Sequence, residues 1–230
     1  KYLINNLLYL IKIIPHYGYT RFVLSIIFEL YYVFRLKNLD IFNFSKKNQY
    51  LFKSKQKYST NNIPTPFYIL FNIKNFFFKK KINNFFIVDL GCGSGRVLKY
   101  FNLYFKCRCL GLDFNKKLIK KNIKESNFKN IKYFYFNLRA FKKLKYLIKT
   151  ENKNNKKIVF FISDSFDAFL IKKILIYMKK NNFSLTLIMI NQINLEIFSK
   201  YKKIYHKEFN NNFLRKTKKK DIKNLTILRI

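Results

Sequence analysis

Glycine is scarce in this sequence, and its distribution predicts where a ligand binds. The chain has 5 glycines among 230 residues, and four of the five are Gly91, Gly93, Gly95 and Gly111. Glycine is needed where the backbone takes a positive φ, or where a ligand approaches the chain with no Cβ in the way. The three alternate glycines at residues 91–95 therefore predict a ligand-binding turn.

Cysteine and histidine are too few, and too widely spaced, for a zinc site. The chain has 3 cysteines and 2 histidines, with no C-x-x-C pair, so we expect no metal centre. We expect Cys107 and Cys109 to point to opposite faces of one strand, which disfavours a mutual disulfide and favours a reducing compartment. Cys92, inside the glycine turn, is either a nucleophile or a small packing residue, and we favour packing.

Acidic residues are also few, and the chain is strongly basic. There are 11 Asp and Glu against 48 Lys and Arg, which gives a formal net charge of +37. Such a balance is typical of proteins that bind nucleic acid or an anionic membrane. The alternative is compositional drift in an A+T-rich genome, because Lys, Asn, Ile, Phe and Tyr dominate while tryptophan is absent. The charge alone neither establishes nor excludes an RNA partner.

No apolar run is long enough to predict a membrane-spanning helix. Residues 3–14 and 22–34 are apolar and predict two helices, with a break at Pro15 and Gly18. The second run includes Glu29 and is shorter than the roughly 20 apolar residues that a span requires. We expect these helices to pack on the rest of the protein, with a membrane surface or a dimer face as alternatives.

The glycine turn lies between a predicted strand and a predicted helix. Residues 85–88 form a short apolar run, and apolar residues from 97 to 105 recur at helical spacing. A second apolar run at residues 109–112 ends in Asp113, roughly 20 positions beyond the turn. In a nucleotide-binding unit, an acid at this distance accepts the ribose hydroxyls.

With this turn and Asp113, the sequence resembles a known family, the class I methyltransferases that use S-adenosylmethionine (SAM). Gly111-Leu112-Asp113 resembles their second motif. The resemblance extends over about residues 58–230. The spacing of the glycines at 91, 93 and 95 differs from the G-x-G-x-x-G of dinucleotide-binding proteins. Their first motif is similar to the segment Val88-Asp89-Leu90-Gly91-Cys92-Gly93-Ser94-Gly95-Arg96.

The resemblance implies an α/β fold with a doubly wound, Rossmann-like sheet of seven strands in the order 3-2-1-4-5-7-6. Composition and apolar runs predict an N-terminal helical extension at residues 1–45 and a linker and lid segment at 46–66. The SAM-binding domain is expected at 67–230. Apolar periodicity places the further helices at residues 67–77, 118–126, 139–148 and 168–180. The further strands are predicted at residues 131–136, 158–162, 185–190, 204–209 and 225–230.

The resemblance also implies which residues contact SAM. Asp113 would bind the ribose hydroxyls. Asn137, after the third strand, would accept a bond from the adenine amino group, or would simply form a surface turn. Thr65 belongs to a Tyr, Pro-Thr-Pro approach similar to that of a bacterial subgroup and would cover the methionine end. The full set of implied cofactor contacts is Asp89, Gly91, Cys92, Gly93, Gly95, Arg96, Asp113, Phe114, Asn137 and Thr65.

Asp164, after the fourth strand, is the predicted catalytic residue. Enzymes of this family that methylate nucleic-acid bases usually have Asp/Asn-Pro-Pro-Tyr/Phe there, whereas this chain has Asp164-Ser165-Phe166. An aspartate at this place would stabilise an acceptor ammonium and assist its deprotonation. The alternative is that Asp164 caps the following helix.

These features predict methyl transfer from SAM to an amine or other nucleophile of a protein or small molecule. Two alternatives stay open, namely RNA methylation that uses the basic surface, and a non-catalytic basic binding module on the same fold. The intact glycine turn with its acid disfavours the second alternative. We expect a cytoplasmic location, with peripheral membrane association through the N-terminal helices as an alternative.

Overall fold

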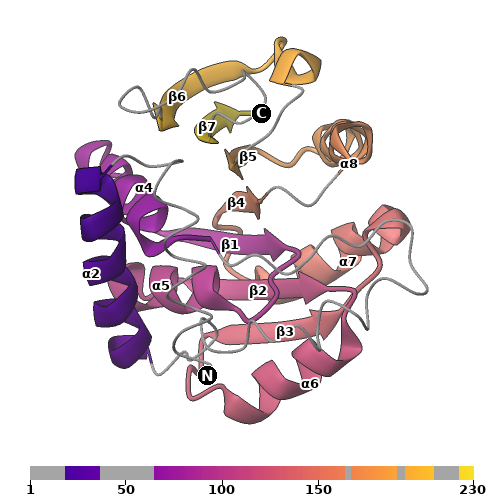
Figure 1. Cartoon of the computed structure of the whole chain (residues 1–230). Coiled ribbons are helices and arrows are strands. Elements are labelled where there is room, and N and C mark those ends of the chain that lie inside the picture. Colours follow the sequence, from indigo (N-terminus) through magenta and orange to yellow (C-terminus); the bar gives the residue numbers. More distant parts are fainter. Residues whose placement is uncertain (1–18, 37–64, 164–166, 191–194, 210–222) are drawn as a thin grey trace, which may run out of the picture. The chain divides into compact units, whose positions relative to one another are not determined.

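A computed structural model describes residues 19–36, 65–163, 167–190, 195–209 and 223–230 (Figure 1). The strands are β1 (Phe85–Leu90), β2 (Arg108–Asp113), β3 (Ile131–Tyr135), β4 (Lys157–Ile162), β5 (Leu185–Ile190), β6 (Lys202–Phe209) and β7 (Lys223–Arg229). The α-helices are α2 (Tyr19–Leu36), α4 (Phe67–Lys79), α5 (Arg96–Phe105), α6 (Lys116–Glu125), α7 (Phe141–Glu151) and α8 (Ala168–Lys180). Two short 3₁₀ helices are η2 (Leu138–Ala140) and η3 (Leu195–Phe198).

The chain divides into two compact units, and the division falls within α4. One unit comprises residues 1–72 and 208–223, and the other comprises residues 73–207 and 224–230. The predicted helix at residues 3–14 and most of the predicted linker lie outside the described residues. The domain division at residues 45 and 66 therefore stays a prediction.

The sheet has seven strands in the order β3-β2-β1-β4-β5-β7-β6, which confirms the predicted fold class (Figure 1). The pairs from β3 to β5 are parallel, and β7 runs antiparallel to β5. Asp89 pairs with Gly111, and Leu90 pairs with Ile162. The carboxyl ends of β1, β2 and β4 therefore meet at one edge of the sheet, where ligands bind in folds of this class.

Helices cover both faces of the sheet, and β1 is therefore buried on both sides. Phe86, Val88 and Leu90 belong to the core beneath α7 and α8. Phe85 points to the opposite face, where its ring centroid lies 5.2 Å from that of Phe77 in α4 and 6.1 Å from that of Phe101 in α5. Such edge-to-face aromatic pairs each add about 0.5–1.5 kcal/mol beyond their buried area. This packing holds α5, and with it the glycine turn, against β1.

Side-chain caps determine where two helices begin. Asn115 caps α6, and its side-chain oxygen accepts the N–H groups of Lys117 and Leu118 at 3.1 and 3.2 Å. Asp167 caps α8 by accepting the Phe169 N–H at 3.0 Å. The predicted bounds of α8 and β5 agree with the structure. The α8 cap suggested for Asp164 is thus supplied by Asp167.

The expectation for Cys107 and Cys109 was wrong. Their sulfur atoms lie 3.7 Å apart, on the same side of the chain, and both side chains are buried. The physical reason is that residues two apart in extended chain share a face, since side chains alternate with a period of two. All three cysteines are free thiols.

Within the other unit, α2 packs against the start of α4. The carboxylate of Glu29 accepts the backbone N–H of Phe67 at 2.8 Å, which places a negative charge at the N-terminus of α4. The Tyr32 ring lies 4.9 Å from the Phe67 ring. In the parts of the chain that the structure describes, no helix combines the length and apolarity needed to cross a membrane.

Gly111 is required by close packing, and replacing it should destabilise the fold. An added Cβ would lie 2.7 Å from Cδ1 of Leu98, 2.7 Å from Cδ1 of Tyr133 and 2.9 Å from the Cys92 sulfur. We expect Gly111→Ala to lower the free energy of unfolding by about 1–3 kcal/mol, as overpacked cores do. Urea denaturation measures this loss.

The control for this prediction is a double-mutant cycle. Leu98→Ala removes one of the two carbon atoms that the new Cβ would meet, so Gly111→Ala should cost less in that background. Strictly additive losses would show that the contact with Leu98 is not the cause.

Candidate functional site

The three glycines after β1 all adopt left-handed backbone conformations. Their φ angles are 84° at Gly91, 51° at Gly93 and 74° at Gly95. Residues with a side chain rarely take these values, so the turn depends on glycine at each position. Gly95 also serves as the N-cap of α5, with no side-chain cap, so the turn leads directly into the helix.

The turn is bound to the end of β2 through the backbone. The N–H groups of Gly91 and Cys92 both donate to the carbonyl oxygen of Leu112, at 2.7 and 3.0 Å. The N–H of Gly95 donates to the carbonyl oxygen of Cys92 at 2.8 Å. These bonds fix the turn beside Asp113, the residue that follows Leu112.

Asp113 holds the middle of the turn with its carboxylate. Its Oδ2 accepts the Gly93 N–H at 2.8 Å, and its Oδ1 accepts the Asn115 N–H at 2.7 Å. A carboxylate offers about four acceptor sites, and Asp113 is only half-buried. The N–H of Phe114 is a third donor to this carboxylate. At least one acceptor site is left for a hydroxyl group, which fits the role that the SAM resemblance implies for this residue.

Burial governs the protonation of the acids at this edge. Burial, and then the negative charge of Asp113, raise the pKa of Asp89 well above its ordinary value of 3.8. Burial also raises the pKa of Asp113, against hydrogen bonds from the N–H groups of Asn115, Gly93 and Phe114 that lower it. A cationic ligand would favour the ionised form of both acids.

The thiol of Cys92 is not activated. Burial, followed by the charges of Asp89 and Asp113, raises its pKa well above the ordinary value of 9.0. A nucleophilic cysteine needs the opposite, a lowered pKa that yields the thiolate. The geometry therefore favours the packing role for Cys92.

Two residues that contribute to the site were missed by the sequence reasoning. Asn122 of α6 is buried, and its side-chain N–H donates to the Gly93 carbonyl oxygen at 2.7 Å. The sequence contained one indication of this role. Asn122 is a polar residue three positions after Ile119, and so falls on the buried face of a lysine-rich helix. Tyr133 of β3 packs under the turn, because a Cβ at Gly95 would collide with its hydroxyl. That hydroxyl is buried and has no hydrogen-bond partner among the described residues.

Three residues at the carboxyl ends of β2 and β3 have aromatic or polar side chains, namely Phe114, Tyr135 and Asn137. Phe114 is 43% exposed and Tyr135 is 51% exposed, and their ring centroids lie 5.7 Å apart. They form an accessible aromatic surface next to Asp113. Asn137 is exposed, and its side-chain oxygen accepts the Arg139 N–H at 3.0 Å. This bond is that of a surface turn, the alternative role considered for Asn137.

The remaining predicted residues are Arg96, Thr65 and Asp164. Arg96 is a buried residue of the first turn of α5. Thr65 is buried and belongs to the unit that contains α2, so its role as a lid stays a prediction. Asp164 lies outside the described residues. Among the residues that the structure describes, no three His, Cys, Asp or Glu side chains come together as metal ligands.

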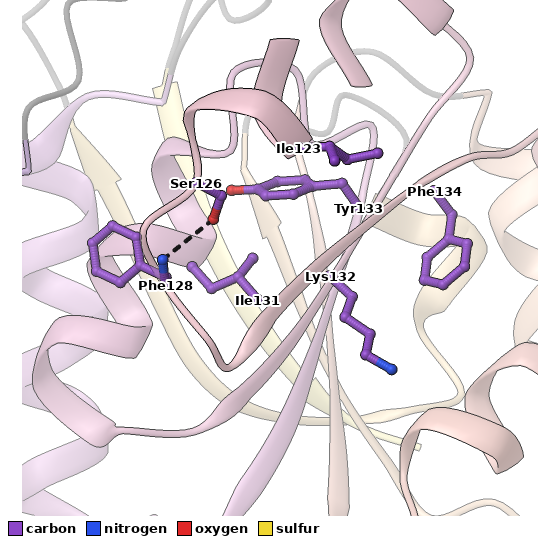
Figure 2. A pocket seen from close by; sticks show the side chains of 7 residues that line it. All are labelled: Ile123, Ser126, Phe128, Ile131, Lys132, Tyr133 and Phe134. Atoms are coloured by element: carbon purple, nitrogen blue, oxygen red, sulfur yellow. Dashed lines mark hydrogen bonds between the residues drawn. The ribbon is translucent and has the colours of Figure 1, made fainter. Parts of the chain in front are cut away.

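A cavity of about 270 Å³ lies elsewhere, between the end of α6 and the edge strand β3 (Figure 2). Ile123, Phe134 and Lys132 contribute to its wall, and Lys132 forms an ion pair with Glu151 at 2.8 Å. Neither the glycines of the turn nor Asp113 line it, although Tyr133, which packs under the turn, does.

Comparison with known protein families agrees with this geometry. Residues 88–188 match the family model described as a methyltransferase domain. The match contains the end of β1, the glycine turn, Asp113 and β4. These residues therefore form a methyltransferase domain, whose cofactor is SAM. No curated protein matches the chain.

Solved structures resemble the chain at low sequence identity. A SAM-dependent methyltransferase from Anabaena variabilis is 13% identical over 70% of this chain and 83% of its own, with a TM-score of 0.49. An RNA methyltransferase from Salinibacter ruber, in complex with S-adenosyl-L-homocysteine, is 12% identical over 73% and 94%, with a TM-score of 0.47. TrmK of M. capricolum, in complex with the same product, is 17% identical over 70% and 67%, with a TM-score of 0.43. At these scores the likeness carries no argument about what this chain binds or acts on.

The raised pKa of Asp89 predicts how stability depends on pH. The folded protein holds the proton of the Asp89 carboxyl group more tightly than the unfolded chain does. The free energy of unfolding therefore falls as pH rises from the pKa of the unfolded chain through that of the folded protein. Asn cannot ionise, so Asp89→Asn should be more stable than the wild type at neutral pH. Its stability should also change less with pH. Urea denaturation over a pH series measures both effects.

The matched control is Asp167→Asn, which changes an exposed carboxylate at the start of α8. It should not reproduce the gain at neutral pH. A neutral-pH stability of Asp89→Asn at or below that of the wild type would contradict the prediction.

Proposed function

We propose that this SAM-dependent methyltransferase transfers the methyl group to an amine, or another nucleophile, of a protein or small-molecule acceptor. The observation that supports cofactor binding most directly is the carboxylate of Asp113, held between the N–H groups of Gly93 and Asn115. It combines an acceptor for hydroxyl groups with a turn whose left-handed backbone favours glycine. The cytoplasmic location stays a prediction.

The residues of the chain would divide the work of binding and alignment. When bound, SAM supplies an activated methyl group on a sulfonium. Asp113 would hold the ribose, Phe114 would contact the adenine, and the turn from Gly91 to Gly95 would enclose the methionine end. Methyl transfer is an in-line displacement, so the protein must position the acceptor and exclude water.

The distribution of charge supports an amine acceptor over RNA. Exposed lysines occur on α6, which lies on the β2 and β3 side with α5, and also on α7 and α8, which cover the opposite face of the sheet. A polynucleotide site would gather basic residues on one surface or along one groove. Lysines on both faces fit compositional drift better than they fit such a groove.

Asp164 is the proposed acid-base residue. It follows β4 by two residues, and the end of β4 pairs with the end of β1, where the glycine turn begins. An amine acceptor must lose a proton to become nucleophilic, and a carboxylate can accept that proton or stabilise the ammonium. Asp164→Asn should therefore lower the transfer rate by about a hundredfold or more while cofactor affinity is retained.

Cofactor binding should depend on Asp113. Hydrogen bonds to a charged acceptor are worth about 1.5–3 kcal/mol, so Asp113→Ala should weaken SAM binding more than tenfold. The loss of the bond to Gly93 would add to this effect by releasing the turn. Isothermal titration calorimetry with SAM measures the change.

Asn152→Ala is the matched control for this variant. Asn152 makes two side-chain hydrogen bonds with Lys156, in the turn before β4 at the opposite edge of the sheet. Its loss should leave SAM affinity unchanged. An equal affinity of Asp113→Ala and wild type would reject the assignment of the cofactor site.

The acceptor class is tested by labelling. The purified protein is incubated with a cell extract and SAM that carries a tritiated methyl group, and the protein, RNA and small-molecule fractions are counted. We expect ribonuclease-resistant label in the protein or small-molecule fraction, and none with Asp113→Ala. Label that ribonuclease releases would show an RNA acceptor and reject the amine proposal, while the enzyme class would stand.

A further inference from the structure

One face of α2 exposes large apolar side chains. The exposed fractions are 39% for Val23, 57% for Ile27, 49% for Leu30, 49% for Tyr31 and 73% for Phe34. At 3.6 residues per turn, these five residues lie within an arc of about 100°, so they form one continuous apolar stripe. Scattered exposed apolar residues are ordinary, but a contiguous group marks a surface that binds something.

The stripe is not a loosely packed core face. The opposite face of α2 is the one that packs on α4, through Glu29, Tyr32 and Phe28. The Phe28 ring lies 4.8 Å from that of Phe71. Because these contacts fix the rotation of the helix, α2 cannot turn its stripe inward without losing them.

The charges of α2 are also divided between its faces. Glu29 is the only acidic residue in α2, and it is buried against the N-terminus of α4. Arg35 lies beside the stripe, where its guanidinium donates a hydrogen bond to the Tyr31 hydroxyl and lies 5.4 Å from the centre of the Tyr31 ring. The exposed side of the helix therefore combines apolar and aromatic groups with positive charge and has no negative charge.

We propose that the α2 stripe docks on a membrane surface that carries anionic headgroups. An apolar stripe needs an apolar partner, which the phosphate backbone of a nucleic acid does not offer. A second copy would bring together two chains with a net charge of +37 each, and they would repel. A bilayer with anionic lipids supplies apolar chains for the stripe and negative charge for the basic groups.

This proposal goes beyond the methyl transfer itself and can fail independently of it. The stripe lies in the unit that contains residues 1–72, and the glycine turn and Asp113 lie in the other unit. SAM affinity therefore reports on the cofactor site, and vesicle binding reports on the stripe.

The test is co-sedimentation of the full chain with vesicles of equimolar phosphatidylcholine and phosphatidylserine, and with vesicles of phosphatidylcholine alone. We expect binding to the mixed vesicles, weakened by added salt. The double variant Ile27→Ser with Phe34→Ser should bind about tenfold more weakly or worse, because two large apolar groups no longer enter the bilayer.

The matched control is Ile123→Ser with Tyr146→Ser, which removes two apolar side chains exposed by 59% and 77% and keeps the net charge. It should bind vesicles as the wild type does. Circular dichroism and SAM titration check that both double variants are folded.

Three outcomes would overturn the proposal. The first is a wild type that does not bind the mixed vesicles. The second is an equal loss of binding in both double variants, which would indicate nonspecific adsorption to the vesicles. The third is a dimer in analytical ultracentrifugation that the Ile27 and Phe34 variant alone dissociates, which would make the stripe an interface between copies.

Discussion

The hydrogen bond from the Gly93 N–H to the Asp113 carboxylate is the contact on which the rest of the site depends. The same carboxylate accepts the N–H of Asn115, and Asn115 caps α6. From α6, Asn122 returns to the carbonyl oxygen of Gly93. Both backbone polar groups of Gly93 are thus satisfied by side chains, and a closed circuit of bonds joins the glycine turn, the end of β2 and α6. A turn held in this way is organised before any ligand arrives, which lowers the ordering cost of binding.

The electrostatics of this circuit contrast with those of the chain as a whole. The chain has a net charge of +37, yet the edge of the sheet at the turn brings Asp89 and Asp113 together in a buried setting. Burial raises both pKa values, so negative charge is costly there until a positive group shares the site. The cationic sulfonium of SAM is such a group, and the chemistry of the cofactor therefore suits the environment that the residues create.

The two units carry different kinds of surface. The unit with the sheet has lysines on helices of both faces, which fits drift in composition more than a specific groove. The unit with α2 combines a buried acid, a packed face and an apolar stripe in one helix. We propose that this surface is a membrane contact.

Local signals in the sequence determined much of the fold and part of the site. Apolar runs and their period gave α8 and β5 their observed bounds, and the strand order 3-2-1-4-5-7-6 followed from the resemblance that the glycine turn and Asp113 carry. These features are visible in sequence because they depend on residues that are close together in the chain. A left-handed turn favours glycine, and a buried strand needs a short apolar run, whatever surrounds them.

Only the tertiary structure decided which side chains meet across the chain. Asn122 reaches Gly93 from 29 residues away, and Tyr133 fills the space left by the missing Cβ of Gly95 and Gly111. The oxygen of Asn137 is used in a local turn, and the sulfur atoms of Cys107 and Cys109 share one side. In α2 the sequence is apolar on several sides, and packing on α4 alone determines that Phe34 faces outward while Tyr32 faces inward. These outcomes depend on register, rotation and side-chain volume in three dimensions, which no single stretch of sequence contains.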